Sequence, residues 1–271
     1  MNLRAAGPGW LFCPADRPER FAKAAAAADV VILDLEDGVA EADKPAARKA
    51  LRETPLDPER TVVRINPAGT DEQARDLEAL ADTAYTTVML SKTESAAQVT
   101  ALAPRDVIAL VETPRGAVFA AEIAAAQGTV ALMWGAEDLV ATLGGNSSRQ
   151  ADGTYRDVAR HVRSTILLAA SAFGRIALDA VHLDIGDTEG LQVEAHDAVA
   201  VGFDGTVCIH PTQIPVVRNA YRPSEEKLDW ARRVLAAART ERGVFAFEGQ
   251  MVDSPVLKHA EMLVRRAGEP A

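Results

Sequence analysis

Short apolar runs rich in β-branched residues alternate with alanine-rich helical patterns along most of this 271-residue chain. The apolar runs are typical of strands that are buried on both faces of a parallel sheet. We expect strands at residues 10–13, 30–35, 61–65, 87–90, 107–111, 130–134, 180–183 and 206–209. We expect helices at residues 17–28, 44–52, 71–81, 95–102, 117–126, 155–173 and 189–201. Strict alternation over eight strands favours an α/β fold, the (β/α)8 TIM barrel, over an open doubly wound sheet.

The chain continues beyond the eighth predicted strand. An amphipathic helix is expected at residues 225–239, and a last helix is expected to begin at Ser254-Pro255. We therefore predict a barrel over residues 1–222 and a C-terminal helical extension over residues 223–271. Because Phe245, Phe247 and Met251 stand beside glycines in this extension, we expect it to pack on a neighbouring subunit.

The charge and the sequence motifs of the chain disfavour several classes of binding partner. The net charge of −10 disfavours nucleic acid and anionic membranes as partners, although local arginines and lysines can still bind an anionic small molecule. No strand is followed by a GxGxxG or GxxxxGK[ST] pattern, which disfavours nucleotide-binding folds. Cys13 and Cys208 lack metal-binding spacing and are expected to be reduced core thiols. With no signal-peptide or membrane-span pattern, we expect a cytoplasmic protein.

Charged side chains follow most of the predicted strands. In a parallel barrel the carboxyl ends of the strands meet at one rim, which is where the chemistry of such barrels takes place. The second strand ends in Asp34, Glu36 and Asp37, and acids clustered in this way need a cationic partner. The other strand ends supply Arg64, Asn66, Lys92, Glu112, Glu137, Asp138, Asp184 and His210. A wet acidic loop with a turn at Asp37-Gly38 is the alternative for the second strand end.

Oxygen ligands suit Mg²⁺, which takes one or two carboxylates and completes its coordination with water and substrate oxygens. Glu112 and Asp138 follow neighbouring strands and are predicted to share such an ion. Glu36 and Asp37 are predicted to hold the metal's waters. The thiolates or paired histidines of a zinc site are absent, and we interpret His210 as a structural residue.

Several further groups are candidates for binding an anionic substrate. Arg64 has the planar fork that matches a carboxylate or an oxyanion, although an ion pair with Glu36 or Asp37 is the alternative. The backbone N–H groups of Gly135, Ala136, Glu137 and Asp138 can cradle an anion.

Each of two segments near the predicted rim has a functional interpretation and an alternative without a functional role. Arg17 and Lys23 lie in the first turns of a predicted helix, where a bound phosphate explains them better than helix stability does; a solvated surface is the alternative. Residues 142–153 form a loop rich in glycine, serine and asparagine, which we interpret as a lid or a plain insertion.

Eight motifs in order resemble those of the citrate lyase β-subunit-like proteins, within the wider group of malyl-CoA, citramalyl-CoA and HpcH/HpaI-type lyases. The motifs are LFCPADRPERFAKA, VVILDLEDGVAEADKPAAR, VVRIN, MLSKTES, ALVETPRG, MWGAEDLVATLG, GFDGTVCIHPTQI and GQMVDSPVL. They extend from about Trp10 to about Leu257. The chain departs from the family pattern at Ser91, where proline is usual, and at Thr206, where lysine is common.

The resemblance implies a barrel that forms a trimer or a hexamer and uses Mg²⁺ as its cofactor. It implies that Glu112 and Asp138 bind the metal and that Arg64 binds substrate. The family's strand-two acids fall on Glu36 and Asp37, and its catalytic aspartate, supplied by an adjacent subunit, falls on Asp253. The backbone from Gly135 to Asp138 would bind the keto-acid carboxylate, and Arg17 and Lys23 would meet the phosphates of coenzyme A.

The implied activity is that of a carbon–carbon lyase. It would cleave or form a β-hydroxyacyl-CoA thioester, such as malyl-, citramalyl-, citryl- or hydroxymethylglutaryl-CoA. Cleavage would yield an acetyl-CoA-type thioester and a keto acid, and the reverse reaction would condense these two. Asp253 would transfer the proton at the acetyl carbon, although it also precedes Ser254-Pro255 and so suits the start of a helix. Two alternatives stay open: a metal-dependent aldolase acting on free pyruvate-type substrates, and a citrate lyase β-type subunit that needs partner chains.

Overall fold

The computed structural model describes residues 3, 6–241 and 243–268 of the chain. The chain divides into two compact units, residues 1–218 and residues 219–271. The sequence places this division between residues 222 and 223 instead.

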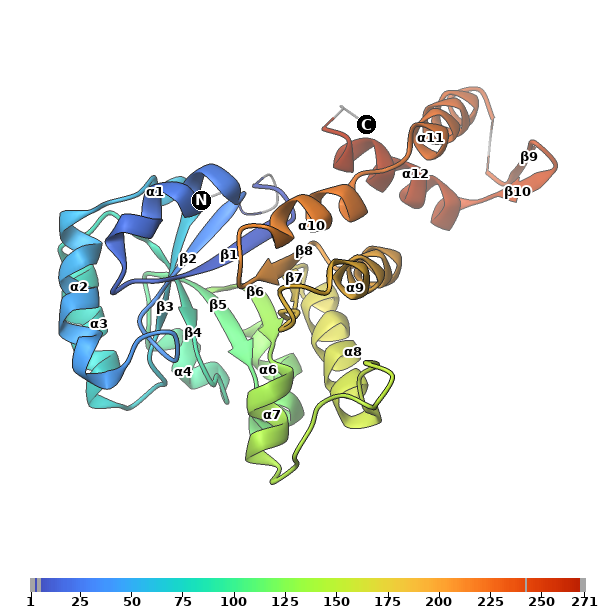
Figure 1. The fold of residues 1–271 in the computed structure, drawn as a ribbon. Helices are drawn as coiled ribbons and strands as arrows, with labels where there is room; N and C mark the ends of the chain where they lie inside the picture. The colour runs from blue at the N-terminus through green and yellow to red at the C-terminus, as the bar shows by residue number, and fades with distance from the viewer. Residues whose placement is uncertain (1–2, 4–5, 242, 269–271) are drawn as a thin grey trace. The chain divides into compact units, whose positions relative to one another are not determined.

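The first unit is built on a closed barrel of parallel strands in the order β1 to β8, with β8 paired to β1 (Figure 1). The strands are β1 (Gly9–Pro14), β2 (Val30–Asp34), β3 (Thr61–Ile65), β4 (Thr87–Leu90), β5 (Asp106–Val111), β6 (Thr129–Trp134), β7 (Ile176–Asp179) and β8 (Gly205–Cys208). The barrel predicted from the strand–helix alternation is therefore confirmed.

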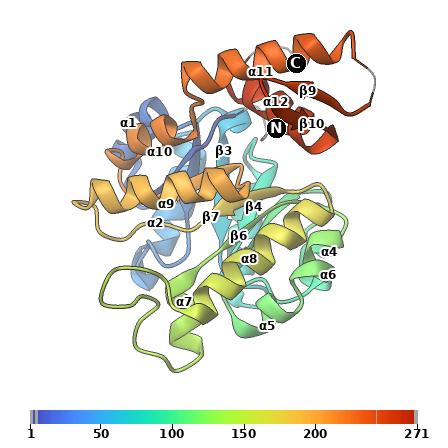
Figure 2. The same cartoon turned by 90° about the vertical axis from the view of Figure 1, so that its right-hand side faces the viewer.

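Helices connect the strands and cover the outside of the barrel. They are α1 (Phe21–Ala27), α2 (Lys44–Glu53), α3 (Asp71–Ala81), α4 (Ala96–Thr100), α5 (Pro114–Val118), α6 (Ala120–Ala125), α7 (Ala136–Thr142), α8 (Asp157–Ala172), α9 (Thr188–Val201) and α10 (Gln213–Tyr221). Short 3-10 helices cover Pro18–Arg20, Glu41–Asp43 and Pro58–Arg60. In Figure 2, α8 crosses the outer face of β6 and β7, and both contacts bury the apolar side of that helix.

The seventh strand differs from its prediction. The sequence indicates a strand at residues 180–183, but the strand ends at Asp179, four residues earlier in the run IALDAVHL. Apolar residues lie on both sides of Asp179 in this run, so the apolar pattern does not fix where pairing stops. The Asp179 carboxylate accepts hydrogen bonds from Trp134 Nε1 at 2.6 Å and from the Arg163 guanidinium, and these bonds mark the strand end. Asp184 consequently lies in an exposed loop rather than at a strand end.

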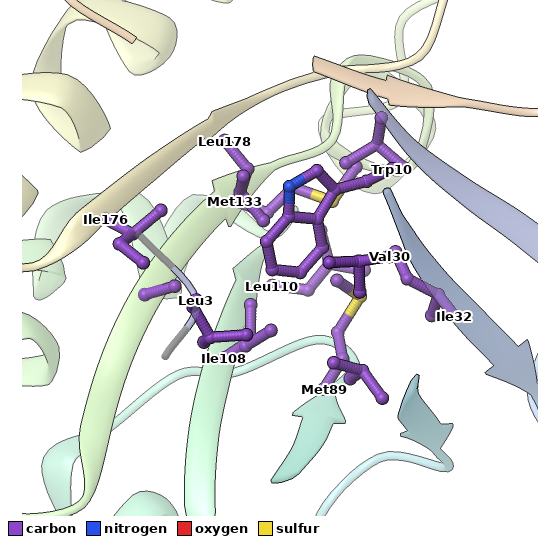
Figure 3. Close-up of a cluster of buried hydrophobic side chains, with 13 residues drawn as sticks. Leu3, Trp10, Val30, Ile32, Met89, Ile108, Leu110, Met133, Ile176 and Leu178 are labelled. Atoms are coloured by element: carbon purple, nitrogen blue, oxygen red, sulfur yellow. The ribbon is translucent and has the colours of Figure 1, made fainter. Parts of the chain in front are cut away.

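Side chains that alternate along the strands fill the interior of the barrel. Val30 and Ile32 point inward from β2, and Ile108 and Leu110 do so from β5 (Figure 3). Trp10 is 1% exposed and lies among them. The intervening residues are buried as well, because the helices cover the outer face of the sheet. This packed interior fixes the strand ends rigidly relative to one another.

Strand pairing decides which polar residues become neighbours. In the β2–β3 pair Asp34 lies opposite Arg64, and in the β5–β6 pair Val111 lies opposite Trp134. The residues that follow the second pair, Glu112 and Gly135, therefore leave the sheet side by side. This register, rather than the order of the sequence, assembles the rim described below.

The second unit contains α11 (Glu225–Ala238), the hairpin of β9 (Phe245–Phe247) and β10 (Gln250–Val252), and α12 (Ser254–Arg266). Leu228, Val234, Ala260 and Leu263 pack between the two helices in a separate hydrophobic cluster. Met251 remains 66% exposed on the hairpin. The docking of this hairpin on a neighbouring subunit stays a prediction.

The two cysteines are buried and unpaired. Burial raises the pKa of Cys13 to about 11 and that of Cys208 to about 12, so both thiols are protonated at neutral pH. None of the helices in the described part of the chain has the length and apolarity needed to cross a membrane.

Candidate functional site

A pocket of about 150 Å³ opens at the carboxyl ends of β3, β5 and β6. Its polar lining comes from residues that the sequence predicts as site residues, and its apolar wall comes from the barrel interior. The lining residues are Phe12, Arg64, Leu110, Glu112, Met133, Trp134, Gly135, Ala136, Glu137, Asp138, Ala180, Val181 and Leu183. The fold thus brings Arg64, Glu112 and Asp138 to one cavity.

The Arg64 guanidinium is held by the carboxylate of Asp34. Arg64 Nε donates to Asp34 Oδ1 at 2.7 Å, and its second terminal nitrogen donates to Asp34 Oδ2 at 2.5 Å. A third nitrogen lies 3.0 Å from Glu36 Oε2, and the guanidinium carbon lies 4.6 Å from the centre of the Phe12 ring. Burial tends to lower the pKa of Arg64, but the charge of Asp34 outweighs it and raises that pKa. Arg64 therefore presents a fixed positive charge to the pocket.

Asp34 also shapes the turn that carries the other strand-two acids. Its carboxylate accepts hydrogen bonds from Glu36 N at 2.9 Å and from Gly38 N at 2.9 Å. A Cβ at position 38 would lie 2.2 Å from Asp34 Oδ2, so only glycine fits there. As a result Glu36 is 3% exposed and faces Arg64, whereas the Asp37 side chain is 60% exposed. The wet-loop alternative describes Asp37 but not Glu36.

Lys92 follows β4 and contacts four carboxylates. Its ammonium nitrogen hydrogen-bonds to Glu36 and lies 3.0 Å from Asp37 Oδ2. The same nitrogen lies 3.5 Å from Asp138 Oδ1 and 3.9 Å from Glu112 Oε1. Burial acts to lower the pKa of Lys92, but the hydrogen bond to Glu36 and the surrounding charges raise it overall. Lys92 is thus a second fixed cation in the site.

Glu112 is 3% exposed and packs directly against Gly135. A Cβ at position 135 would lie 2.8 Å from Glu112 Oε2, which is closer than real contacts allow. Burial is the main cause that raises the pKa of Glu112 to about 8, and the negative charge of Asp138 is the next largest cause. A bound cation would lower the pKa of Glu112 again, because its positive charge favours the ionised carboxylate. Glu112 would then be charged, as a cation-binding carboxylate must be.

Asp138 and Glu137 lie in the first turn of α7. Gly135, which precedes this helix at the N-cap position, makes no side-chain capping bond. The Asp138 side chain is 40% exposed and so is accessible from the pocket mouth. Glu137 is engaged elsewhere, because its carboxylate accepts a 2.6 Å hydrogen bond from Ser148 Oγ. Uncapped N–H groups at a helix start favour a carboxylate ligand.

The donor set fits Mg²⁺. Among the residues that the structure describes, no group of three or more histidine, cysteine or acidic side chains is placed to hold a metal ion. Glu112 and Asp138 supply two carboxylates beside an open pocket, and Mg²⁺ commonly takes one or two carboxylates together with water and substrate oxygens. The glycine at position 135 leaves the Glu112 carboxylate the room to turn toward such an ion.

A larger cavity of about 790 Å³ adjoins this pocket and shares Glu137, Ala180 and Leu183 with it. The loop that the sequence suggests as a lid forms one of its walls. Ser148 of that loop is buried against Glu137, and Arg149 pairs with Glu194 of α9 and stacks on the Tyr155 ring at 3.9 Å. These contacts hold the middle of the loop against the barrel.

The remaining predicted residues lie outside the small pocket. Arg17 is exposed at the start of the Pro18–Arg20 3-10 helix, and Lys23 is exposed on α1. His210 Nδ1 lies 2.8 Å from Thr212 Oγ1 in the turn after β8. Asp253, in the second unit, begins α12, and its carboxylate accepts a 3.3 Å hydrogen bond from Val256 N. The helix-start alternative for Asp253 is thus present, and its catalytic role stays a prediction.

The sequence placed Asp34 and Lys92 at the rim and indicated a cationic partner for the strand-two acids, but it identified no specific partner for either residue. Asp34 is the last residue of β2, and its position opposite Arg64 depends on the strand register. Lys92 has a left-handed backbone with φ of 48°, which is uncommon for a residue other than glycine. The acid that ends an otherwise apolar strand was the signal from which a cationic partner for Asp34 was expected.

Comparison with known proteins agrees with this geometry. A family model described as HpcH/HpaI aldolase/citrate lyase matches residues 9–211. The chain is 85% identical over 269 residues to a citrate lyase subunit beta-like protein of Mycobacterium tuberculosis, covering 99% of this chain and 98% of that protein. It is 33% identical over 273 residues to the human mitochondrial citramalyl-CoA lyase, covering 88% and 78% of the two chains.

A solved structure is similarly close. The CitE protein of Mycobacterium tuberculosis, in complex with magnesium, acetoacetate and coenzyme A, superimposes with a TM-score of 0.94 at 85% identity. The match covers 98% of this chain and 100% of that one.

Proposed function

This chain belongs to the HpcH/HpaI aldolase/citrate lyase family, and from that premise we propose that it is a Mg²⁺-dependent carbon–carbon lyase acting on a coenzyme A thioester. Its substrate would be a β-hydroxyacyl-CoA such as malyl-, citramalyl-, citryl- or hydroxymethylglutaryl-CoA. The products would be an acetyl-CoA-type thioester and a keto acid, and the reaction could run in either direction. One observation carries the proposal: Arg64, Glu112 and Asp138 line a single pocket at the start of α7.

Glu112 and Asp138 would hold the Mg²⁺ ion. When bound, the ion would act as a Lewis acid toward the hydroxyl and carboxylate oxygens of the substrate. Two carboxylates leave most coordination positions to water and substrate, as this chemistry requires. The magnesium in the complex of the 85% identical protein supports Mg²⁺ as the ion.

Arg64 would bind the substrate oxygen on which negative charge develops as the carbon–carbon bond breaks. Its guanidinium is held in advance by Asp34, so little reorganisation is needed when that charge appears. Glu36 and Asp37 would orient waters and the neighbouring cations Arg64 and Lys92. The backbone N–H groups from Gly135 to Asp138 would bind the carboxylate of the keto acid.

Asp253 would exchange the proton at the acetyl carbon. It would donate that proton during cleavage and remove it during condensation. Because Asp253 belongs to the C-terminal unit, we propose that it serves the barrel of a neighbouring subunit in a homotrimer. Arg17 and Lys23, both exposed on the β1–α1 side, would contact the phosphates of coenzyme A.

The test is a substrate screen of the purified chain with and without Mg²⁺. The four thioesters named above are offered together with the corresponding free hydroxy acids, and the release of keto acid is measured. We expect turnover of at least one thioester, abolished by EDTA and restored by Mg²⁺. Turnover of free acids alone would favour the pyruvate-type aldolase, and activity only after partner chains are added would favour a citrate lyase β-type subunit.

A further inference from the structure

We propose that Lys92 is a resident cation that competes with Mg²⁺ for the carboxylates of the site, and so sets the protein's affinity for the metal. The inference rests on the proposed function, because it takes Glu112 and Asp138 as the metal ligands. Its basis is the position of one ammonium group among four carboxylates that come from three separate segments of the chain.

The ammonium contacts both predicted metal ligands and both strand-two acids. It lies 3.5 Å from Asp138 Oδ1 and 3.9 Å from Glu112 Oε1. Its closer partners are Glu36 and Asp37, with Asp37 Oδ2 at 3.0 Å. In the metal-free protein Lys92 therefore neutralises the acids that would otherwise repel one another across the rim.

The backbone holds Lys92 in this place. Its φ of 48° is strained for a lysine, and such a conformation persists only where the surroundings enforce it. Ser91 Oγ donates to Ile65 O at 2.8 Å, and Thr93 N donates to Leu110 O at 2.9 Å, so both neighbours are fixed to adjacent strands. Lys92 N itself donates to Glu112 Oε1 at 3.1 Å. The side chain thus starts from a fixed point beside the metal ligand.

Metal binding would then have to proceed against this ammonium. A divalent ion shared by Glu112 and Asp138 would lie within a few ångström of Lys92 Nζ, where two positive charges repel strongly. The Lys92 side chain is 29% exposed and already contacts Glu36 and Asp37. It therefore has room to move away from Glu112 and Asp138 while keeping those two partners. The free energy needed to displace the Lys92 ammonium reduces the binding free energy of the metal by the same amount.

A lysine that only stabilises the fold would behave differently. Its removal would lower stability without changing the affinity for Mg²⁺. Removal of a competing cation would also lower stability in the absence of metal. Unlike removal of a purely structural lysine, however, it would strengthen Mg²⁺ binding. The two roles are therefore separated by a direct measurement of Mg²⁺ binding.

The experiment is calorimetric titration of the full chain with Mg²⁺, using Lys92→Met, Lys92→Gln and Lys92→Arg. We expect Met and Gln to tighten Kd roughly tenfold or more, because a unit positive charge next to the site is lost. Arg keeps the charge and should stay within about threefold of the parent. Lys49→Met, at a 66% exposed lysine of α2, is the matched control and should leave Kd unchanged.

Thermal melts with and without Mg²⁺ complete the test. Lys92→Met should melt at a lower temperature than the parent without metal, and Mg²⁺ should restore most of the difference. Unchanged or weaker Mg²⁺ binding by Met and Gln would overturn the inference, as would variants that stay unfolded at saturating Mg²⁺. If neither the parent nor the variants bind Mg²⁺, the metal assignment itself fails. If the parent binds Mg²⁺ and the Met and Gln variants bind it with the same affinity, the inference alone fails.

Discussion

Asp34 on β2 and Arg64 on β3 lie directly opposite each other, and their side chains form a two-point hydrogen-bonded ion pair at the pocket rim. Asp34 is 2% exposed and the Arg64 side chain is 11% exposed, so water screens the pair only weakly. This pair fixes the direction of the guanidinium that faces the proposed substrate.

Asp34→Asn should weaken both the fold and the site. The amide removes the charge that holds Arg64 at two points and leaves the Glu36 carboxylate beside the guanidinium. Loss of one member of a buried pair typically costs about 3–5 kcal/mol of unfolding free energy. Urea denaturation measures that loss. The double variant Asp34→Asn/Arg64→Gln should lose less than the sum of the single variants, and additive losses would contradict the pairing.

Gly135→Ala should disable metal binding while the barrel remains folded. The added Cβ would lie 2.8 Å from Glu112 Oε2 and would displace that carboxylate. We expect at least a tenfold loss of Mg²⁺ affinity by calorimetry, together with loss of turnover. Gly186→Ala is the control, because its Cβ meets only the exposed Asp184 side chain at 3.3 Å. Normal Mg²⁺ affinity in Gly135→Ala would refute the role of the close Gly135–Glu112 contact.

Asp253→Asn should separate proton transfer from helix capping. Asparagine caps helices about as well as aspartate does, so the melting temperature should change little. An amide cannot act as the general acid or base, and turnover should fall by roughly 10²–10⁴. Asp57→Asn, at another capping aspartate, is the matched control and should retain activity. Near-normal turnover in Asp253→Asn would rule out the proposed role in proton transfer.

The stability that His182 contributes should depend on pH. The hydrogen bond to Glu194, at 2.9 Å, raises the pKa of His182 above its ordinary value, although burial opposes this. The contribution is therefore fully present below the unfolded pKa of about 6.5 and is lost as pH rises through the higher folded pKa.

Replacement by glutamine tests this dependence. His182→Gln should lower the unfolding free energy more at pH 6 than at pH 9, as measured by urea denaturation at both values. His161→Gln, at an exposed histidine of α8, is the control. Equal losses at the two pH values would contradict the ionised His182–Glu194 pair.

The local pattern of the sequence was sufficient for most of the fold. Alternating apolar residues and helix patterns indicated all eight barrel strands, and only the seventh was misplaced, because the run IALDAVHL is apolar beyond the point where pairing ends. Helix α3 has the predicted bounds, since Thr70 caps it and acids fill its first turn. The expected helix at residues 117–126 is divided between α5 and α6.

The sequence by itself determined which chemical groups end the strands, because that depends only on residues next to each other in the chain. It thereby indicated Arg64, Glu112 and Asp138 as members of one rim. Only the tertiary structure decided which groups touch, since strand register and barrel closure join positions far apart in sequence. That is why Asp34 meets Arg64 across β2 and β3, and why the ammonium of Lys92 lies among four carboxylates.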